Sequence, residues 1–156
     1  MYDGGNQRRE RKVMTNTTDT IDYIVNIAKS NNASKGELLS IGHLLLDYEI
    51  RDLLIAQTIR GDDDLQLMKD FFLFLTDSFD WKSEHLAPIA TLTSIFCYFS
   101  GETEQAETAL TIAKTADPDF RLGVLFAGIL SKGIPAFAIK TVILDAFDAL
   151  ESSDVA

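Results

Sequence analysis

The stretch Leu86–Asp119, LAPIATLTSIFCYFSGETEQAETALTIAKTADPD, decides the fold class, because two helical patterns meet in it at Ser100-Gly101. The first pattern lies in a run from His85 to Gly101 that holds no Asp, Glu, Lys or Arg. This run is shorter than the roughly 20 apolar residues of a membrane span, so we expect a buried helix. The second pattern places small or apolar residues on one stripe, at Ala106, Ala109, Leu110, Ala113 and Ala116. Small residues allow two helices to approach closely, and the sequence therefore predicts a packed helix pair.

The second helix of this pair follows the pattern of a tetratricopeptide repeat. The second half of that repeat has Gly, Ala, large apolar, Ala and Pro residues at fixed offsets, and the same offsets here hold Gly101, Ala106, Leu110, Ala113 and Pro118. The first half departs from the pattern, because its tryptophan, leucine and tyrosine positions hold Ala90, Thr93 and Cys97. A shift by one repeat length gives a weaker second match. It predicts a final helix pair at 120–132 and 135–150.

A longer likeness rests on three strings, Tyr98-Phe99-Ser100-Gly101-Glu102, Ala116-Asp117-Pro118-Asp119-Phe120 and Gly133-Ile134-Pro135. Together they resemble the C-terminal part of an actinobacterial family called domain of unknown function 4192. With Ile50-Arg51-Asp52-Leu53-Leu54 included, the likeness covers about two thirds of the chain, and the N-terminal half of the family is expected to be missing. As the family's name implies, the resemblance brings no activity and no catalytic residue.

The rest of the chain after Met14 also has apolar residues at helical spacing, and no alternating β-branched run competes with it. Ser34 and Glu37 form a capping box at one helix start. Asp62-Asp63-Asp64 precedes another helix, where free amides and the helix dipole stabilise carboxylates, whereas a calcium loop needs further oxygen ligands. That helix, 65–79, is apolar on more than half its circumference and is expected to be central. We predict an all-α fold, with helical hairpins packed as a compact bundle and a tetratricopeptide-like C-terminal half.

The composition is that of a soluble globular protein. A chain of 156 residues that is 46% hydrophobic can bury a core without disulfides or metals. Its net charge of −10, from 24 acidic and 14 basic residues, disfavours nucleic acid and anionic membranes as partners. Cys97 is the single cysteine, so no internal disulfide forms, and we expect a cytoplasmic protein.

The chain is expected to consist of a tail, residues 1–13, and one helical domain, residues 14–156. The tail is polar and has no apolar core segment of the kind that a secretion signal needs. It carries four basic residues beside two acidic ones, so residues 14–156 have a net charge of −12. Two interpretations stay open: a disordered tail, or a natural start at Met14.

Candidate catalytic residues are few, and each has a structural explanation. His43 is expected on a helix, either exposed or satisfied in the core, and His85 at a helix start. Two histidines so far apart, with one cysteine, do not have the spacing of a zinc site. Cys97 lies among Phe96, Tyr98 and Phe99, which predicts a buried, neutral and inert thiol. We therefore expect no catalytic, cofactor-binding or metal-binding residue, and no enzyme.

The function favoured by these features is a non-enzymatic interaction module that binds a protein partner of unknown identity. In a repeat unit, the concave face would be lined by Thr91, Ile95, Tyr98, Phe99, Leu122, Leu125 and Ile129. This face is too apolar to stay in water, so it must be covered by the N-terminal helices or by a second chain. We expect a two-fold homodimer that Ile95→Glu or Leu125→Glu would dissociate.

Two alternatives stay open. The acidic charge is also that of a nucleic-acid mimic, which would inhibit a DNA-binding protein by presenting carboxylates. A small-molecule binder would need a pocket in an aromatic-lined core, formed by Phe71, Phe74, Phe96, Tyr98 and Phe126.

A shortened chain that begins at Met14 is expected to melt at the same temperature as the full chain, because residues 1–13 have no apolar pattern to bury. Thermal unfolding followed by circular dichroism measures this. A midpoint lower by more than about 4 °C, equivalent to roughly 1 kcal/mol for a domain of this size, would show that the tail is structural.

Overall fold

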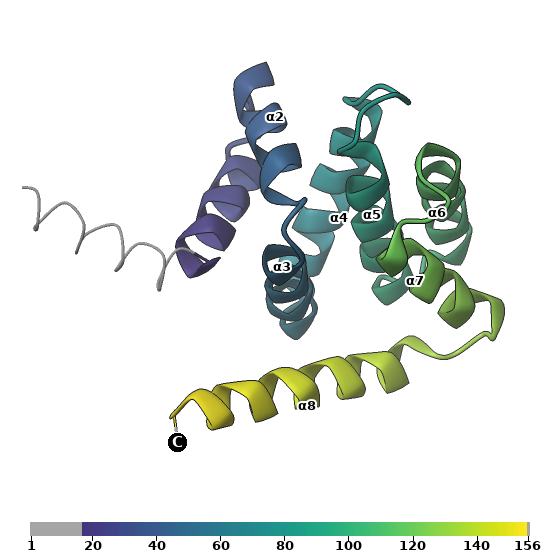
Figure 1. The fold of residues 1–156 in the computed structure, drawn as a ribbon. Helices are drawn as coiled ribbons and strands as arrows, with labels where there is room; N and C mark the ends of the chain where they lie inside the picture. Colours follow the sequence, from purple (N-terminus) through teal and green to yellow (C-terminus); the bar gives the residue numbers. More distant parts are fainter. Residues whose placement is uncertain (1–16, 156) are drawn as a thin grey trace, which may run out of the picture.

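The computed structural model describes residues 17–155, which form helices joined by short turns, with no strand within that range (Figure 1). Residues 17–30 form the first helix. The later helices are α2 (Lys35–Leu44), α3 (Tyr48–Arg60), α4 (Asp62–Asp77), α5 (Leu86–Phe99), α6 (Thr103–Ala116), α7 (Arg121–Ser131) and α8 (Ala136–Val155). The predicted all-α fold is confirmed. None of the described helices is both long and apolar enough to cross a membrane. The predicted tail and the alternative start at Met14 lie outside the described residues.

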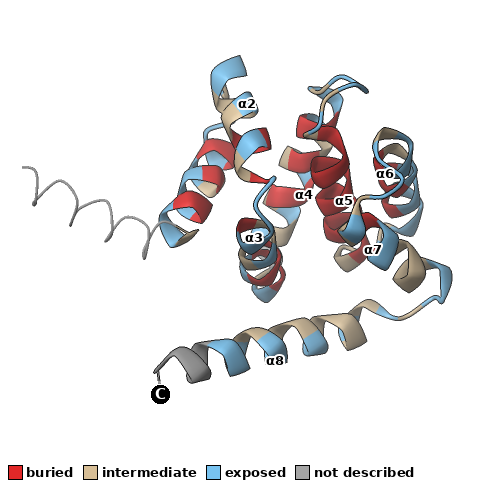
Figure 2. Cartoon of the chain, in the orientation of Figure 1, coloured by how far each residue is buried: buried red, intermediate tan, exposed pale blue. Residues whose placement is uncertain are grey.

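Helix α5 is the centre of the fold. All thirteen residues from Leu86 to Tyr98 are buried, as the run without charges predicts (Figure 2). The helix contacts α3, α4, α6, α7 and α8. Two of its buried polar side chains are hydrogen-bonded inside the core: Thr93 Oγ1 donates to the Ile89 carbonyl over 2.8 Å, and Ser94 Oγ donates to the Ala106 carbonyl over 2.6 Å. These two hydroxyls therefore keep a hydrogen bond although they are buried away from water.

The predicted pair of helices is α5 and α6, and glycine makes the turn between them. Gly101 has φ +80°, which favours glycine because it has no Cβ. Its amide donates to the Tyr98 carbonyl, and the Glu102 amide donates to the Cys97 carbonyl over 2.9 Å. This is a Schellman motif, which satisfies the last carbonyls of α5. On the facing helix the predicted small residues Ala106, Ala109 and Ala113 are buried, together with Leu110, whereas Ala116 is half-buried.

Helix α4 is central, as predicted, through Met68, Phe72 and Leu75, which are fully buried. The rings of Phe72 and Phe96 meet edge to face with centroids 5.2 Å apart. The sequence pattern did not predict that Lys69 is buried as well. Its Nζ lies 2.6 Å from Glu102 Oε1, and this hydrogen bond raises the pKa of Lys69 against the opposing effect of burial. The ion pair ties α4 to the turn between α5 and α6.

The N-terminal helices begin at capping residues. The predicted capping box is present: the Glu37 amide donates to Ser34 Oγ over 3.1 Å, and the Ser34 amide donates to Glu37 Oε1 over 2.9 Å. Asp47 accepts a hydrogen bond from the Glu49 amide and starts a separate helix, so α2 and α3 are two helices rather than one bent helix. Helix α4 begins at Asp62, directly after Gly61. The structure does not describe the side chains of Asp62 and Asp63.

The chain reverses between α7 and α8 by a second Schellman motif. Gly133 has φ +64°, its amide donates to the Leu130 carbonyl, and the Ile134 amide donates to the Ile129 carbonyl. The Tyr98 hydroxyl donates to the Ile134 carbonyl and so attaches this turn to α5. Helix α8 then runs back beneath α7 and α3 (Figure 1), in contact with α3 and α5. The predicted helices at 120–132 and 135–150 are therefore confirmed, with small shifts of their ends.

The substitution Ala106→Leu is expected to lower the free energy of unfolding by about 1 to 3 kcal/mol, because Ala106 is fully buried against α5 and a larger side chain would overpack the contact. Glu104→Leu is the control, since Glu104 is exposed on the same helix and its replacement should change stability little. Chemical denaturation of both variants measures the difference. Equal losses at the two positions would contradict the close packing of α5 on α6.

Candidate functional site

An apolar groove lies between α3, α5, α7 and α8, and encloses a cavity of about 250 Å³. Of its twelve lining residues, eleven are apolar and one, Asp52, is a carboxylate. The lining residues are Asp52 and Ile55 on α3, Ile95 and Phe99 on α5, Leu122, Leu125, Phe126 and Ile129 on α7, and Ile139, Val142, Ile143 and Phe147 on α8. Four helices that are separate in the sequence thus contribute side chains to one apolar site.

Five of the seven residues predicted for the concave face line this groove: Ile95, Phe99, Leu122, Leu125 and Ile129. The other two, Thr91 and Tyr98, are buried in contacts within the chain. Thr91 Oγ1 lies 3.3 Å from the position that a Cβ on Gly123 would take, and the Tyr98 ring meets Phe126 with centroids 5.3 Å apart.

Within the predicted face, exposure differs sharply from one residue to the next. Ile95 is 3% exposed, Phe99, Leu122 and Ile129 are half-buried, and Leu125 is 64% exposed. The seven residues predicted for this face therefore do not form one uniform surface. The structure brings most of these side chains together, but Leu125 alone among them is open to solvent.

The cover of this face comes partly from a helix that the sequence pattern did not assign to it. Cover was predicted from the N-terminal helices or from a second chain. Asp52 and Ile55 of α3, an N-terminal helix, do line the groove, and α8 supplies the fourth wall. The reason is the reversal at Gly133, which returns α8 across the groove. This cover is shallow. No described residue of α8 is fully buried (Figure 2), and Phe137, Val142 and Leu150 are 75%, 65% and 61% exposed.

Charged groups near the groove serve structural roles. Arg60 on α3 and Asp148 on α8 form an ion pair of 2.9 Å in which both side chains are well exposed. Arg51 donates to the carbonyls of Leu45 and Leu46, and its guanidinium lies 5.1 Å from the centroid of the Phe120 ring. Burial raises the pKa of Asp52, and the adjacent Arg51 partly opposes this rise. The site is therefore suited to apolar contact, with charge only at its edges.

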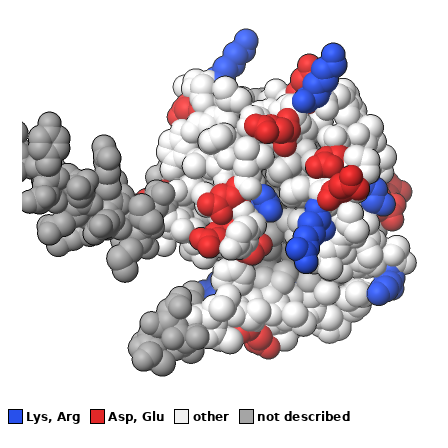
Figure 3. Space-filling model, viewed as in Figure 1, with Lys and Arg blue, Asp and Glu red and all other residues white. Residues whose placement is uncertain are grey.

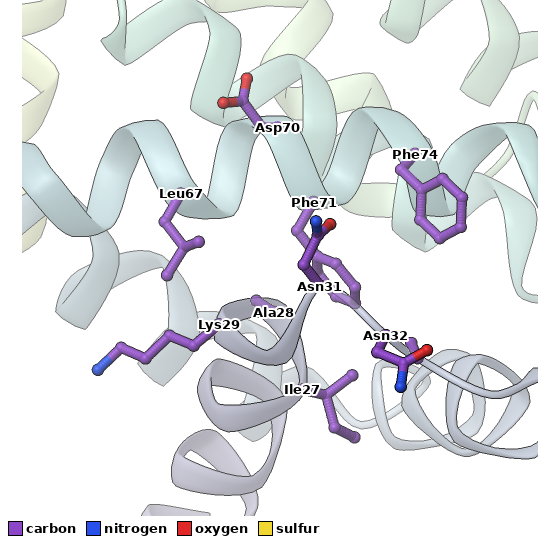
Figure 4. A pocket seen from close by; sticks show the side chains of 10 residues that line it. Ile27, Ala28, Lys29, Asn31, Asn32, Leu67, Asp70, Phe71 and Phe74 are labelled. Atoms are coloured by element: carbon purple, nitrogen blue, oxygen red, sulfur yellow. The ribbon is translucent and has the colours of Figure 1, made fainter.

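The aromatic residues proposed for a small-molecule pocket do not line one cavity. Phe96 packs on Phe72 in the core, and Tyr98 packs on Phe126. Phe71 and Phe74 instead line a separate cleft of about 510 Å³, between α4 and residues 27–33 (Figure 4). In this cleft the side chains of Lys29 and Asp70 point in different directions, away from Phe71, so they do not converge on a ligand. The five aromatic residues of this alternative are therefore divided between the core and separate clefts.

The fold brings the two histidines together, which their separation in the sequence did not suggest. The rings of His43 and His85 lie 6.2 Å apart at their centroids, and Ser83 Oγ lies 3.1 Å from His85 Nδ1. A Cβ on Gly42 would come within 2.7 Å of the Phe79 ring and 3.2 Å of the His85 Cβ, so the glycine allows Phe79 and His85 to pack closely on α2. Among the described side chains, no group of three or more His, Cys, Asp or Glu is placed to hold a metal ion.

Cys97 is fully buried, as predicted from its aromatic neighbours. Its Sγ lies 3.9 Å from Gln105 Oε1. The pKa of the thiol is raised to about 11, mainly by burial and also by the nearby Glu102, while Lys69 acts in the opposite direction. The thiol is therefore protonated at neutral pH and is unsuited to act as a nucleophile.

Cys97 of the folded chain is expected to react with 5,5′-dithiobis(2-nitrobenzoate) at least about 100-fold more slowly than in the unfolded chain, because a thiol pKa near 11 instead of 9.0 lowers the thiolate fraction by that factor. Absorbance at neutral pH, with and without denaturant, gives both rates. Comparable rates in the two states would mean that Cys97 is accessible and ionised in the fold.

The sequence of the chain was compared with those of known protein families, and one family matches it. The profile of Domain of unknown function (DUF4192) matches residues 2–136, a longer part of the chain than the two thirds expected. The match spans α2 to α7 and reaches the first residue of α8. No curated protein and no solved structure matches the chain. Since the profile covers well over half of its length, the chain belongs to the DUF4192 family.

Proposed function

We propose that this chain is a non-enzymatic protein-interaction module whose binding site is the apolar groove on α3, α5 and α7. The observation that carries the proposal is the exposure of Leu125 and Val142, 64% and 65%, on the rim of a cavity whose lining is almost wholly apolar. Among the eleven large apolar residues that are exposed in the described chain, Leu125 and Val142 are the two that line this cavity. Exposed apolar side chains beside an apolar cavity are typical of a binding site.

A protein partner fits this site better than a small molecule. The cavity, about 250 Å³, is smaller than the roughly 300–1,000 Å³ of common ligand pockets, and Asp52 is the single polar residue in its lining. Small-molecule sites usually add several convergent polar groups that fix orientation. A helix or loop of another protein needs mainly complementary apolar side chains. Cys97 is a free and buried thiol, and a single cysteine without a disulfide partner agrees with a cytoplasmic setting.

The alternative of an acidic nucleic-acid mimic has less support. On the face drawn in Figure 3, acidic side chains alternate with basic ones, and large areas carry neither. A mimic of a phosphate backbone needs carboxylates in a regular row, because the phosphates of one DNA strand repeat along its length. The groove rather than the charge is therefore the basis of the proposal.

The substitution Leu125→Glu is expected to reduce capture of a protein partner from cells by at least about 10-fold, because it places a charge at the rim of an apolar site. Leu39→Glu is the matched control: Leu39 is 56% exposed on α2, does not line the groove and should leave capture unchanged. Quantitative mass spectrometry of the captured proteins compares wild type with both variants.

Equal loss with both variants, or no loss with Leu125→Glu, would contradict the proposal. Light scattering on the same proteins tests whether the partner is a second copy, since a homodimer would double the mass of 17.3 kDa and Leu125→Glu would restore it. Ile95→Glu is unsuitable for this purpose. Ile95 is 3% exposed, so a glutamate there would bury a charge and unfold the chain.

A further inference from the structure

Helix α8 packs weakly for its length. It has 20 residues, yet none of those with a described side chain is fully buried, whereas α6 buries four residues in 14. Its large side chains at Phe137, Val142 and Leu150 are already in water. Helix α8 is therefore packed less deeply than α6, and elements with few buried apolar contacts open at a lower free energy than the core does.

The inner face of α8 has a definite pattern. Ile139, Ile143 and Phe147 are spaced by four residues, which places them on one stripe of a helix, and all three line the cavity. Asp148 follows directly and pairs with Arg60 on α3. The groove thus accepts a helix with large apolar residues at three successive turns, followed by an acidic residue that meets Arg60.

The other three walls of the groove contact one another as well as α8. Helix α3 is in direct contact with α5, and α5 is in direct contact with α7. The turn at Ile134 is held by the Tyr98 hydroxyl, so the chain has a fixed point from which α8 departs after Pro135. The family match, which ends at residue 136, includes these three walls but not the body of α8.

We propose that α8 is an intramolecular occupant of the groove, and that the partner is an amphipathic helix with the pattern of α8 that takes its place. This inference rests on the proposed function and specifies both the kind of partner and its regulation. The partner carries large apolar residues spaced by four positions and an acidic residue next to the last of them. Binding in the groove then competes with α8, so the closed chain binds its partner less tightly than an open one.

The test uses a fluorescein-labelled peptide of residues 136–155, titrated by fluorescence anisotropy into three full-length proteins: wild type, Ile143→Asp and Phe137→Asp. Ile143→Asp removes an inner contact of α8 and is expected to bind the peptide at least about 10-fold more tightly than wild type, because the attached helix no longer competes. Phe137→Asp is the matched control, since Phe137 is 75% exposed on the same helix and does not line the groove. It should bind like wild type.

Two further proteins are controls for misfolding and for nonspecific binding. Phe147→Asp should open the groove as Ile143→Asp does, and circular dichroism confirms that each variant keeps its helices. A peptide that itself carries Ile143→Asp should not bind any of them. Leu125→Glu combined with Ile143→Asp should lose the gained affinity, because Leu125 lies in the groove and not in α8.

Equal peptide affinity for all folded variants would overturn the inference, and so would the absence of binding to both opened variants. If peptide binding fails while partner capture still depends on Leu125, the inference about α8 is wrong and the proposed function stands. The two failures are therefore distinguishable.

Discussion

The structure depends on the complete burial of α5. A helix with thirteen consecutive buried residues has no side that can face water, so every neighbouring helix must offer it an apolar or small-residue surface. Five helices, α3, α4, α6, α7 and α8, provide such a surface, and together they surround α5 at the centre of the described fold. Thr93 and Ser94 are tolerated there because each donates to a nearby carbonyl. A charge anywhere along this helix would lack both water and a partner.

Two turns built in the same way carry the chain away from this core and back. Gly101 and Gly133 both have positive φ, and the carbonyls at the ends of α5 and α7 accept the two hydrogen bonds of a Schellman motif. The first turn brings α6 back along α5, and the small residues of α6 allow the two helices to pack closely. The second turn returns α8 across the groove, where the large side chains of Ile139, Ile143 and Phe147 line the cavity. The different depth of α6 and α8 follows from side-chain size on their inner faces.

The polar groups of the described interior are used for packing. Lys69 is paired with Glu102, Arg51 caps carbonyl groups and lies over Phe120, and Cys97 is a protonated thiol. With these groups engaged, the apolar groove between α7 and α8 is the part of the described surface that best explains a function. In the proposed function this groove binds a protein partner. In the proposed regulation α8, which lines the groove, competes with that partner for it.

Helical periodicity, the uncharged run before Gly101 and the capping residues Ser34 and Glu37 were sufficient to predict the all-α fold, the buried α5 and the α5–α6 pair. These features are local, because a helix and its caps are set by residues within a few positions of one another. The buried ion pair of Lys69, the contact of His43 with His85 and the covering of the groove by α8 depended on tertiary structure. Each joins residues that are distant in the chain. Five groove residues were predictable from repeat spacing, but their exposure was not, since it is decided by whichever helix packs over them.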